Sequence, residues 1–162
     1  MNAIEVIRAK RAHLSRLANE GGAAGEIEAV SRVEQWIPRP KGAALSLLLQ
    51  ELSAVGVRIR RSSFDAISTP KPVDFGCRES VRAALPEMTF IEVKSSNQSR
   101  VKPGFEGFFF ALTESEIAAA DQLGARHKVA LFNRLTGELQ LTNIPDIIAR
   151  SRSMTWQLSI QL

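Results

Sequence analysis

The sequence has little of what several protein classes require. Its 162 residues include one cysteine, Cys77, which excludes an internal disulfide and suits a reducing, cytoplasmic setting. The two histidines, His13 and His127, lie far apart, which argues against a Cys/His zinc site. Motifs typical of a motor, a methyltransferase or a nucleotide-binding protein are missing too.

Long apolar runs are also missing. The longest, such as "ALSLLL" and "GFFFAL", are much shorter than the roughly 20 residues that cross a bilayer. The first residues, "MNAIEVIRAKRAHL", are charged throughout and carry no secretory hydrophobic core. We therefore expect a cytoplasmic protein without a membrane partner.

The composition that is present suits one globular domain. Hydrophobic residues make up 44% of the chain and charged residues 23%, enough for a sizeable core. The net charge is +4 with a pI near 9.7. A basic balance permits a polyanionic partner such as nucleic acid but does not require one.

Two hydrophobic periodicities alternate along the chain. Spacing near 3.6 residues predicts helices over 3–18, 25–37, 42–56, 113–124 and 145–150, with a helical turn at 78–85 inside a proline-rich connection over 69–87. Alternation predicts strands over 57–61, 64–68, 88–95, 107–112, 128–133, 138–142 and 155–160, the first two forming one bent strand or a hairpin. Thr113 and Glu116 have capping-box spacing, and Gly124 marks a helix end.

The order of these elements predicts the fold class. Helices come first, then strands, a helix and more strands, which fits an α/β or α+β sheet with helices packed against it. We expect an N-terminal helical pair over residues 1–40 that serves recognition, dimerisation or contact with a partner protein. A sheet domain is expected over residues 41–162.

The stretch "MTFIEVKSSNQ" contains the charged residues that attract most interest. Alternation places Glu92 and Lys94 on one face of a predicted strand. Because a buried unpaired charge is costly, these two side chains either face solvent as a weak ion pair or form a site. If Asp65 lies on the adjacent strand, its carboxylate and that of Glu92 come close together, and one of them cannot ionise comfortably.

A hard divalent cation would relieve that conflict. Mg²⁺ or Mn²⁺ prefers oxygen ligands, so we expect Asp65, Glu92 and the carbonyl of Val93 to hold the metal. Lys94 would then orient an attacking water or stabilise charge that develops on a phosphate. Asp74 is an alternative first acid, although it lies in the proline-rich connection, and Glu51 is an alternative third ligand.

With these residues the chain resembles the PD-(D/E)xK nuclease superfamily, whose signature is a strand acid followed by a hydrophobic strand with E-x-K. The segment from "IEVKSSNQ" to "KVALF" is similar to the nuclease-like domain at the carboxy end of NO VEIN-type proteins. The resemblance covers residues 42–133 and implies a restriction-endonuclease-like mixed sheet flanked by helices. It makes Asp65, Glu92 and Lys94 the expected catalytic residues of a magnesium-dependent endonuclease.

The resemblance also implies a nucleic-acid partner, expected to be DNA. Arg60, Arg61, Arg100 and Lys102 are the candidates for phosphate contact, with ordinary solubilising charge as the alternative. A homodimer is expected if both strands of a duplex are cut. Two other functions stay open: a catalytically inactive nuclease-fold DNA-binding module, and a protein-interaction module whose sheet happens to contain E-x-K.

Overall fold

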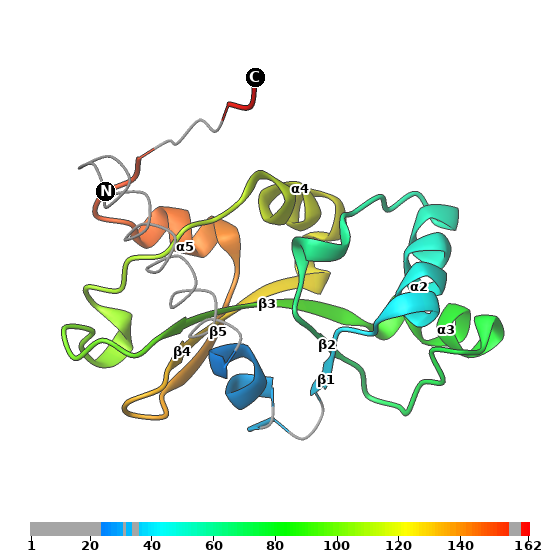
Figure 1. Cartoon of the computed structure of the whole chain (residues 1–162), viewed down its shortest axis with the longest axis horizontal. Coiled ribbons are helices and arrows are strands. Elements are labelled where there is room, and N and C mark those ends of the chain that lie inside the picture. The colour runs from blue at the N-terminus through cyan, green and yellow to red at the C-terminus, as the bar shows by residue number, and fades with distance from the viewer. Residues whose placement is uncertain (1–23, 31, 34–35, 156–159) are drawn as a thin grey trace, which may run out of the picture.

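The structure is a computed structural model that describes residues 24–30, 32–33, 36–155 and 160–162 (Figure 1). Its strands are β1 (Trp36–Pro38), β2 (Ala66–Ser68), β3 (Thr89–Ser96), β4 (His127–Asn133) and β5 (Leu139–Thr142). Its α-helices are α2 (Gly42–Ala54), α3 (Arg78–Ala84), α4 (Glu114–Leu123) and α5 (Ile144–Arg150), and residues 24–30 are also helical. A short 3₁₀ turn, η1 (Arg61–Ser63), comes shortly before β2.

The five described strands form one mixed sheet in the order β1-β2-β3-β4-β5. β3 and β4 run parallel, whereas the other neighbouring pairs are antiparallel. A parallel pair needs a crossover connection, and α4 lies in the chain that makes it. The predicted class, a mixed sheet flanked by helices, is confirmed at this level.

Helices cover both faces of this sheet (Figure 1). On one face, α2, α3 and α4 enclose a cluster in which the rings of Phe64 and Phe90 meet edge to face, with centroids 5.1 Å apart. On the opposite face, residues 24–30 pack over Ile91 and Val93. Alternate residues of β3 therefore face different layers, and its even-numbered residues face the layer that contains α4.

Helix α4 forms where its sequence signals predict. The hydroxyl of Thr113 accepts the backbone N–H of Glu116 at 3.3 Å, and the Glu116 carboxylate accepts the N–H of Thr113 at 2.9 Å. Gly124, with φ +56°, ends the helix. A tight turn joins β4 to β5, where the N–H of Gly137 donates to the carbonyl of Asn133 at 2.8 Å. β3, β4, β5, α2, α3 and α5 also form close to their predicted ranges.

The predicted strand over residues 57–61 is wrong. Val57 is buried and Ile59 is half-buried while Arg58 is exposed, so the alternation is real. However, the side-chain amide of Gln122 takes the place of a neighbouring strand: it accepts the N–H of Arg58 at 2.6 Å and donates to its carbonyl at 2.7 Å. The segment therefore lies against α4 in an extended form, and the expected bent strand or hairpin is replaced by η1.

The predicted strand over residues 107–112 is also wrong. Phe108 and Phe110 pack against the cluster that includes Val129, whereas Phe109 is 72% exposed. This burial pattern has period two, but the backbone of the segment forms no ladder with the described strands. Alternation therefore predicted correctly which side chains are buried. It predicted incorrectly that the backbone joins the sheet by hydrogen bonds.

The predicted helix over residues 25–37 ends early. The described helix covers residues 24–30, and Trp36–Pro38 instead forms β1, which pairs with β2 at the sheet edge. An edge strand suits Pro38, because proline has no N–H to donate. The predicted helix over 3–18 and most of the predicted strand over 155–160 lie outside the described residues.

Residues on the amino side of position 40 complete the sheet unit. β1 adds a strand to β2, and residues 24–30 cover the face of the sheet opposite α4. The described part of the predicted 1–40 extension thus shares its core with the domain that follows. None of the described helices has the length and apolar character needed to cross a bilayer.

Candidate active site

Asp65 lies where β2 begins beside β3. Its backbone N–H donates to the carbonyl of Ile91 at 2.8 Å, as in an antiparallel ladder. Its side chain then continues the ladder, because Oδ2 accepts the N–H of Val93 at 2.8 Å. Arg39 fixes the segment from the other side, since its backbone N–H donates to the Asp65 carbonyl at 2.8 Å. The carboxylate of Asp65 is therefore held along the edge of β3.

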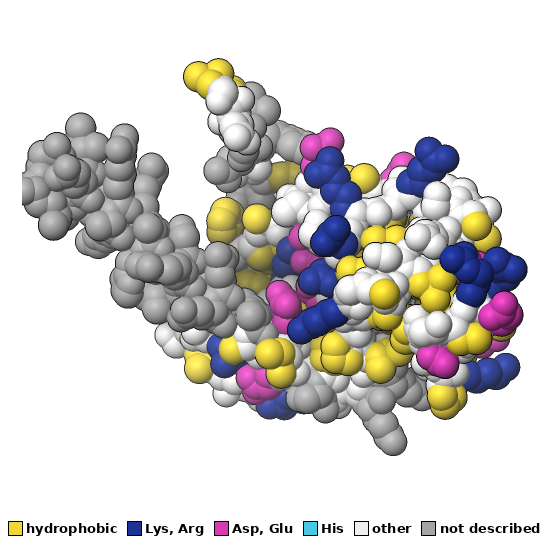
Figure 2. Space-filling view, turned by 45° about the vertical axis from the view of Figure 1, so that its right-hand side comes forward, with side chains coloured by type: hydrophobic (Ala, Val, Ile, Leu, Met, Phe, Trp, Pro, Cys, Tyr) yellow, Lys and Arg dark blue, Asp and Glu magenta, His cyan; other side chains and the backbone are white. Residues whose placement is uncertain are grey.

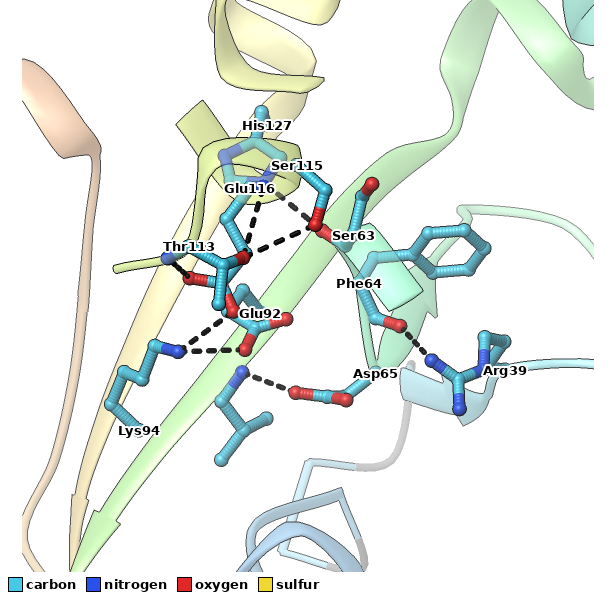
Figure 3. Close-up of polar contacts among 11 residues, drawn as sticks. Arg39, Ser63, Phe64, Asp65, Glu92, Lys94, Thr113, Ser115, Glu116 and His127 are labelled. Carbon is cyan, nitrogen blue, oxygen red and sulfur yellow. Dashed lines mark hydrogen bonds and ion pairs between the residues drawn. The ribbon is translucent and has the colours of Figure 1, made fainter. Parts of the chain in front are cut away.

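Glu92 and Lys94 project from the same face of β3, and Figure 3 shows how their side chains meet. The Lys94 ammonium lies 2.9 Å from Glu92 Oε1 and 2.9 Å from Glu116 Oε1. The side chains of Glu92 and Lys94 are 8% and 14% exposed. The alternative of a solvated strand face is therefore wrong: both side chains lie inside the protein and contact each other.

Glu116 brings the first turn of α4 into this cluster. Its Oε2 accepts the backbone N–H of Thr113, and its Oε1 accepts a hydrogen bond from Lys94, so one carboxylate caps the helix and pairs with the strand. The sequence predicted the cap alone. Capping-box spacing reports on contacts within four residues, whereas the contact with Lys94 depends on how α4 packs over β3.

The two acids on the neighbouring strands perturb each other. Burial raises the pKa of Glu92 to about 9, with the nearby Asp65 charge adding to the shift and Lys94 opposing it. Burial also raises the pKa of Asp65, although the N–H of Val93 partly offsets this. Glu92 Oε2 is buried and has no hydrogen-bond partner among the described residues. The pair therefore favours a bound proton or a bound cation.

Glu116 behaves differently from Glu92. Burial favours the neutral acid, but the contact with the Glu92 carboxyl and the charge of Lys94 outweigh it, so the pKa of Glu116 is lowered. For Lys94, burial is outweighed by Glu92 and then Glu116, so the pKa of the ammonium is raised. At neutral pH we thus expect Glu92 to hold a proton while Glu116 and Lys94 stay charged.

A fourth acid, Glu26, approaches Asp65 from the helix on the other face of the sheet. Burial raises the pKa of Glu26, and the charge of Asp65 adds to this shift, while Arg39 opposes it. The helix comes close enough because Gly25 lies directly over Ser95, where a Cβ would be 2.0 Å from the Ser95 hydroxyl. Nothing in the local sequence around Glu26 indicates this approach.

The oxygen atoms available to a cation come from few residues. No three His, Cys, Asp or Glu side chains within the described part of the chain are placed together as a metal site. A cation would therefore need main-chain oxygen in addition to the carboxylates of Asp65 and Glu92. The carbonyl of Val93 lies on the same side of β3 as its N–H, which points to Asp65.

Two alternative ligands lie elsewhere. Asp74 is exposed in the connection before α3, where its Oδ1 accepts the N–H of Gly76 at 2.9 Å. Glu51 is buried on α2 and forms ion pairs with Arg78 and Arg82 of α3, which account for both of its oxygen atoms. The structure thus places Asp65 beside Glu92, whereas Asp74 and Glu51 lie away from Glu92.

Arg60, Arg61, Arg100 and Lys102 are all exposed. The first two lie in or next to η1, four or five residues before Asp65, and the carbonyl of Arg61 accepts a hydrogen bond from the Arg39 guanidinium at 2.8 Å. The last two lie in the loop that follows β3. Figure 2 shows Lys and Arg side chains spread over one face of the molecule among apolar and acidic ones. Contact of these residues with nucleic acid stays a prediction.

His127, for which no role was predicted, is a buried polar neighbour of the cluster. Its ring Nε2 lies 3.4 Å from the carbonyl oxygen of Ser63, and the residue is 1% exposed. Burial lowers the pKa of His127, so the ring is expected to be neutral at pH 7. It links η1 to β4 beneath the charged cluster (Figure 3).

Comparison of the chain with protein-family models, curated proteins and solved structures finds no match. The chemistry of the site is thus the basis for a functional conclusion. One cluster contains the buried carboxyls of Asp65 and Glu92, which repel each other, and the ammonium of Lys94. Within it, Glu92 Oε2 lacks a hydrogen-bond partner among the described residues. Such a group can bind a hard cation and present an ammonium beside it.

Proposed function

We propose that this protein is a metal-dependent nuclease that hydrolyses phosphodiester bonds of nucleic acid, with DNA as the expected substrate. The observation that carries the proposal is the convergence of Asp65, Glu92 and Lys94 at the point where β2 begins beside β3. The E-x-K strand and the preceding acid are the residues on which the resemblance to PD-(D/E)xK nucleases rests. A restriction-endonuclease-like fold belongs to the same proposal, supported by the mixed sheet with helices on both faces.

The residues present fit a magnesium or manganese ion. Burial and the mutual repulsion of Asp65 and Glu92 favour a positive charge between them, and the buried Oε2 of Glu92 lacks a protein partner among the described residues. Asp65, Glu92 and the carbonyl of Val93 would hold the ion. When bound, it supplies positive charge that polarises the phosphate and makes a water more acidic.

The protein's own groups orient this chemistry. The N–H of Val93 fixes the direction of the Asp65 carboxylate, and the strand places Lys94 on the same face as Glu92. The Lys94 ammonium donates hydrogen bonds and can orient a water or stabilise negative charge on a phosphate oxygen. Because the surrounding side chains exclude most solvent, that charge acts at a low local dielectric.

Plasmid cleavage tests this proposal. We expect purified protein with Mg²⁺ to nick supercoiled DNA, and expect Lys94→Ala to lower the rate about 100-fold or more because the ammonium is lost. Lys71→Ala is a matched control, since Lys71 is an exposed lysine in the connection before α3. Removal of the metal with a chelator should stop cleavage by the wild type. Cleavage that continues unchanged in the Lys94→Ala protein would refute the assigned site.

An inactive nuclease-fold module that binds DNA or protein is the second candidate. It is favoured by the two hydrogen bonds of Lys94 to Glu92 and Glu116, which give both acids a partner without a metal. Binding of DNA without cleavage, over a range of Mg²⁺ and Mn²⁺ concentrations, would support this function. A homodimer and a recognition role for residues 1–40 are compatible with either candidate function.

A further inference from the structure

Lys94 has two carboxylate partners, and they are held in different ways. Glu92 is its neighbour on β3, at 2.9 Å from the ammonium. Glu116 belongs to α4, and its second oxygen accepts the N–H of Thr113 at 2.9 Å. The capping box therefore fixes the orientation of the Glu116 carboxylate, whereas Glu92 Oε2 has no partner among the described residues.

We propose that Glu116 is a positioning residue: it is the fixed hydrogen-bond partner on α4 that holds the Lys94 ammonium in place when Glu92 engages a cation. This inference rests on the proposed function, because it concerns the lysine to which that function assigns a role. It adds a residue that acts through Lys94 and touches neither metal nor substrate.

Burial makes such a partner necessary. The side chains of Lys94 and Glu116 are 14% and 5% exposed, so water stabilises neither charge well. A carboxylate of Glu92 committed to a cation has less electron density to offer the ammonium. Glu116 then supplies the compensating charge, and its own charge is stabilised by Lys94 and by the N–H of Thr113.

The test compares wild-type protein with E116Q and E114Q. The amide at position 116 keeps an oxygen that can accept the N–H of Thr113 but removes the charge. Glu114 is the matched control, because it lies in the same first turn of α4 and is exposed. Two readouts are used: kcat and KM for plasmid cleavage with Mg²⁺, and the Tm of the metal-free protein in a double-mutant cycle that combines E116Q with Lys94→Met.

We expect E116Q to lower kcat by about 10- to 100-fold, since misplacement of a catalytic group costs this much. Its KM should change less than about threefold, because substrate binding is not altered. In the metal-free protein, E116Q should lower the Tm in the wild-type background, because the buried ammonium of Lys94 loses a partner. In the Lys94→Met background it should raise the Tm, because it removes a buried carboxylate that has lost its partner. E114Q should match the wild type in both readouts.

The outcomes separate this inference from the proposed function. An E116Q substitution that changes the Tm equally in the wild-type and Lys94→Met backgrounds, or an unchanged kcat, overturns the inference. Wild-type protein that cleaves nothing overturns the proposed function, and the Tm cycle of the metal-free protein then decides whether Glu116 holds Lys94. If E116Q fails to fold, it is combined with Lys94→Met: a higher Tm than K94M alone supports the inference, and a lower Tm shows that Glu116 only caps α4.

Discussion

Two glutamates in one cluster reach opposite charge states because their neighbours differ. Glu92 is buried and lies near the carboxylate of Asp65, and both conditions favour its neutral form. Glu116 has the N–H of Thr113 and the ammonium of Lys94 as partners, which favours its charged form. The residue types are identical, so the assignment of a proton to one and a charge to the other depends on contacts between distant segments.

The raised pKa of Glu92 makes a prediction about stability. An acid whose pKa is higher in the folded protein contributes stability below its unfolded value, near 4.5, and this contribution is lost as the pH rises towards about 9. Glu92→Gln keeps the neutral state at every pH. We therefore expect E92Q to gain on the order of 2–4 kcal/mol in free energy of unfolding relative to the wild type between pH 5 and pH 9.

Chemical denaturation at several pH values measures this difference. Glu87→Gln is the control, because it makes the same chemical change at an exposed position before β3. An E92Q protein whose advantage is equal at pH 5 and pH 9 would show that Glu92 is not a buried proton-binding group. E92Q should at the same time lose cation binding, which links the gain in stability to a loss of the proposed function.

The residues of the site could be predicted to different degrees. Strand alternation placed Glu92 and Lys94 on one face correctly, since that relation is local. Asp65 was placed on a neighbouring strand, and the structure shows it immediately before β2, with its side chain acting as a ladder partner of Val93. Glu116 and Glu26 reach the cluster through packing, which leaves no mark in the spacing of the sequence.

At the scale of elements, signals carried by the backbone were more informative than hydrophobic patterns. The capping box and Gly124 predicted α4 correctly, because these residues satisfy the helix ends directly. Alternating side chains also occur over residues 57–61 and 107–112, where the chain is extended against a helix or a cluster without joining the sheet. Alternation reports which side is buried, whereas a strand also needs a partner for its N–H and C=O groups.

The helix over residues 24–30 makes a prediction about packing. In the interior of most helices, replacing glycine by alanine stabilises the helix by about 1 kcal/mol. At Gly25, however, a Cβ would lie 2.0 Å from Ser95 Oγ and 2.5 Å from Ser95 Cβ, so the helix would have to move away from β3. We therefore expect Gly25→Ala to destabilise the protein by about 1–3 kcal/mol, the usual cost of overpacking.

Thermal unfolding checks this expectation, with Ser95→Gly as a compensating change. The double variant removes the two Ser95 atoms that the new methyl group meets, so it should recover part of the Tm that Gly25→Ala loses. Ser95→Gly alone serves as the reference for the cost of glycine in a strand. A Tm that rises in Gly25→Ala would mean that helix propensity outweighs packing at this contact.

At the scale of the whole molecule, the sheet separates two layers that both supply acids to one point. Lys94 and Glu116 meet on the side of α4, while Glu26 comes from the helix on the opposite face and approaches Asp65 at the sheet edge. The site thus lies where β2 begins, and each layer contributes a charged group. A cluster built in this way forms only when helix, sheet and edge segment have all packed.

If the protein binds nucleic acid as proposed, its net charge of +4 favours the encounter, and the salt dependence of binding can be measured. Arg60 and Arg61 are exposed and lie just before Asp65 in the chain. If both contact phosphates, log Kd should vary with log salt less steeply by about 2 in the Arg60→Ala/Arg61→Ala protein, since each lost contact releases about one counterion fewer. Fluorescence anisotropy of a labelled duplex in chelator, between low and moderate salt, gives this slope without cleavage.

A control must remove the same charge elsewhere. Lys41 and Lys71 are exposed, one before α2 and the other in the connection before α3, so Lys41→Ala/Lys71→Ala lowers the net charge equally. General attraction of a basic molecule predicts the same slope for both double variants, because only the total charge matters. Phosphate contact beside Asp65 predicts a smaller slope for the Arg60 and Arg61 variant alone. DNA binding that is insensitive to salt in every variant would exclude phosphate contact and favour a protein partner for this sheet.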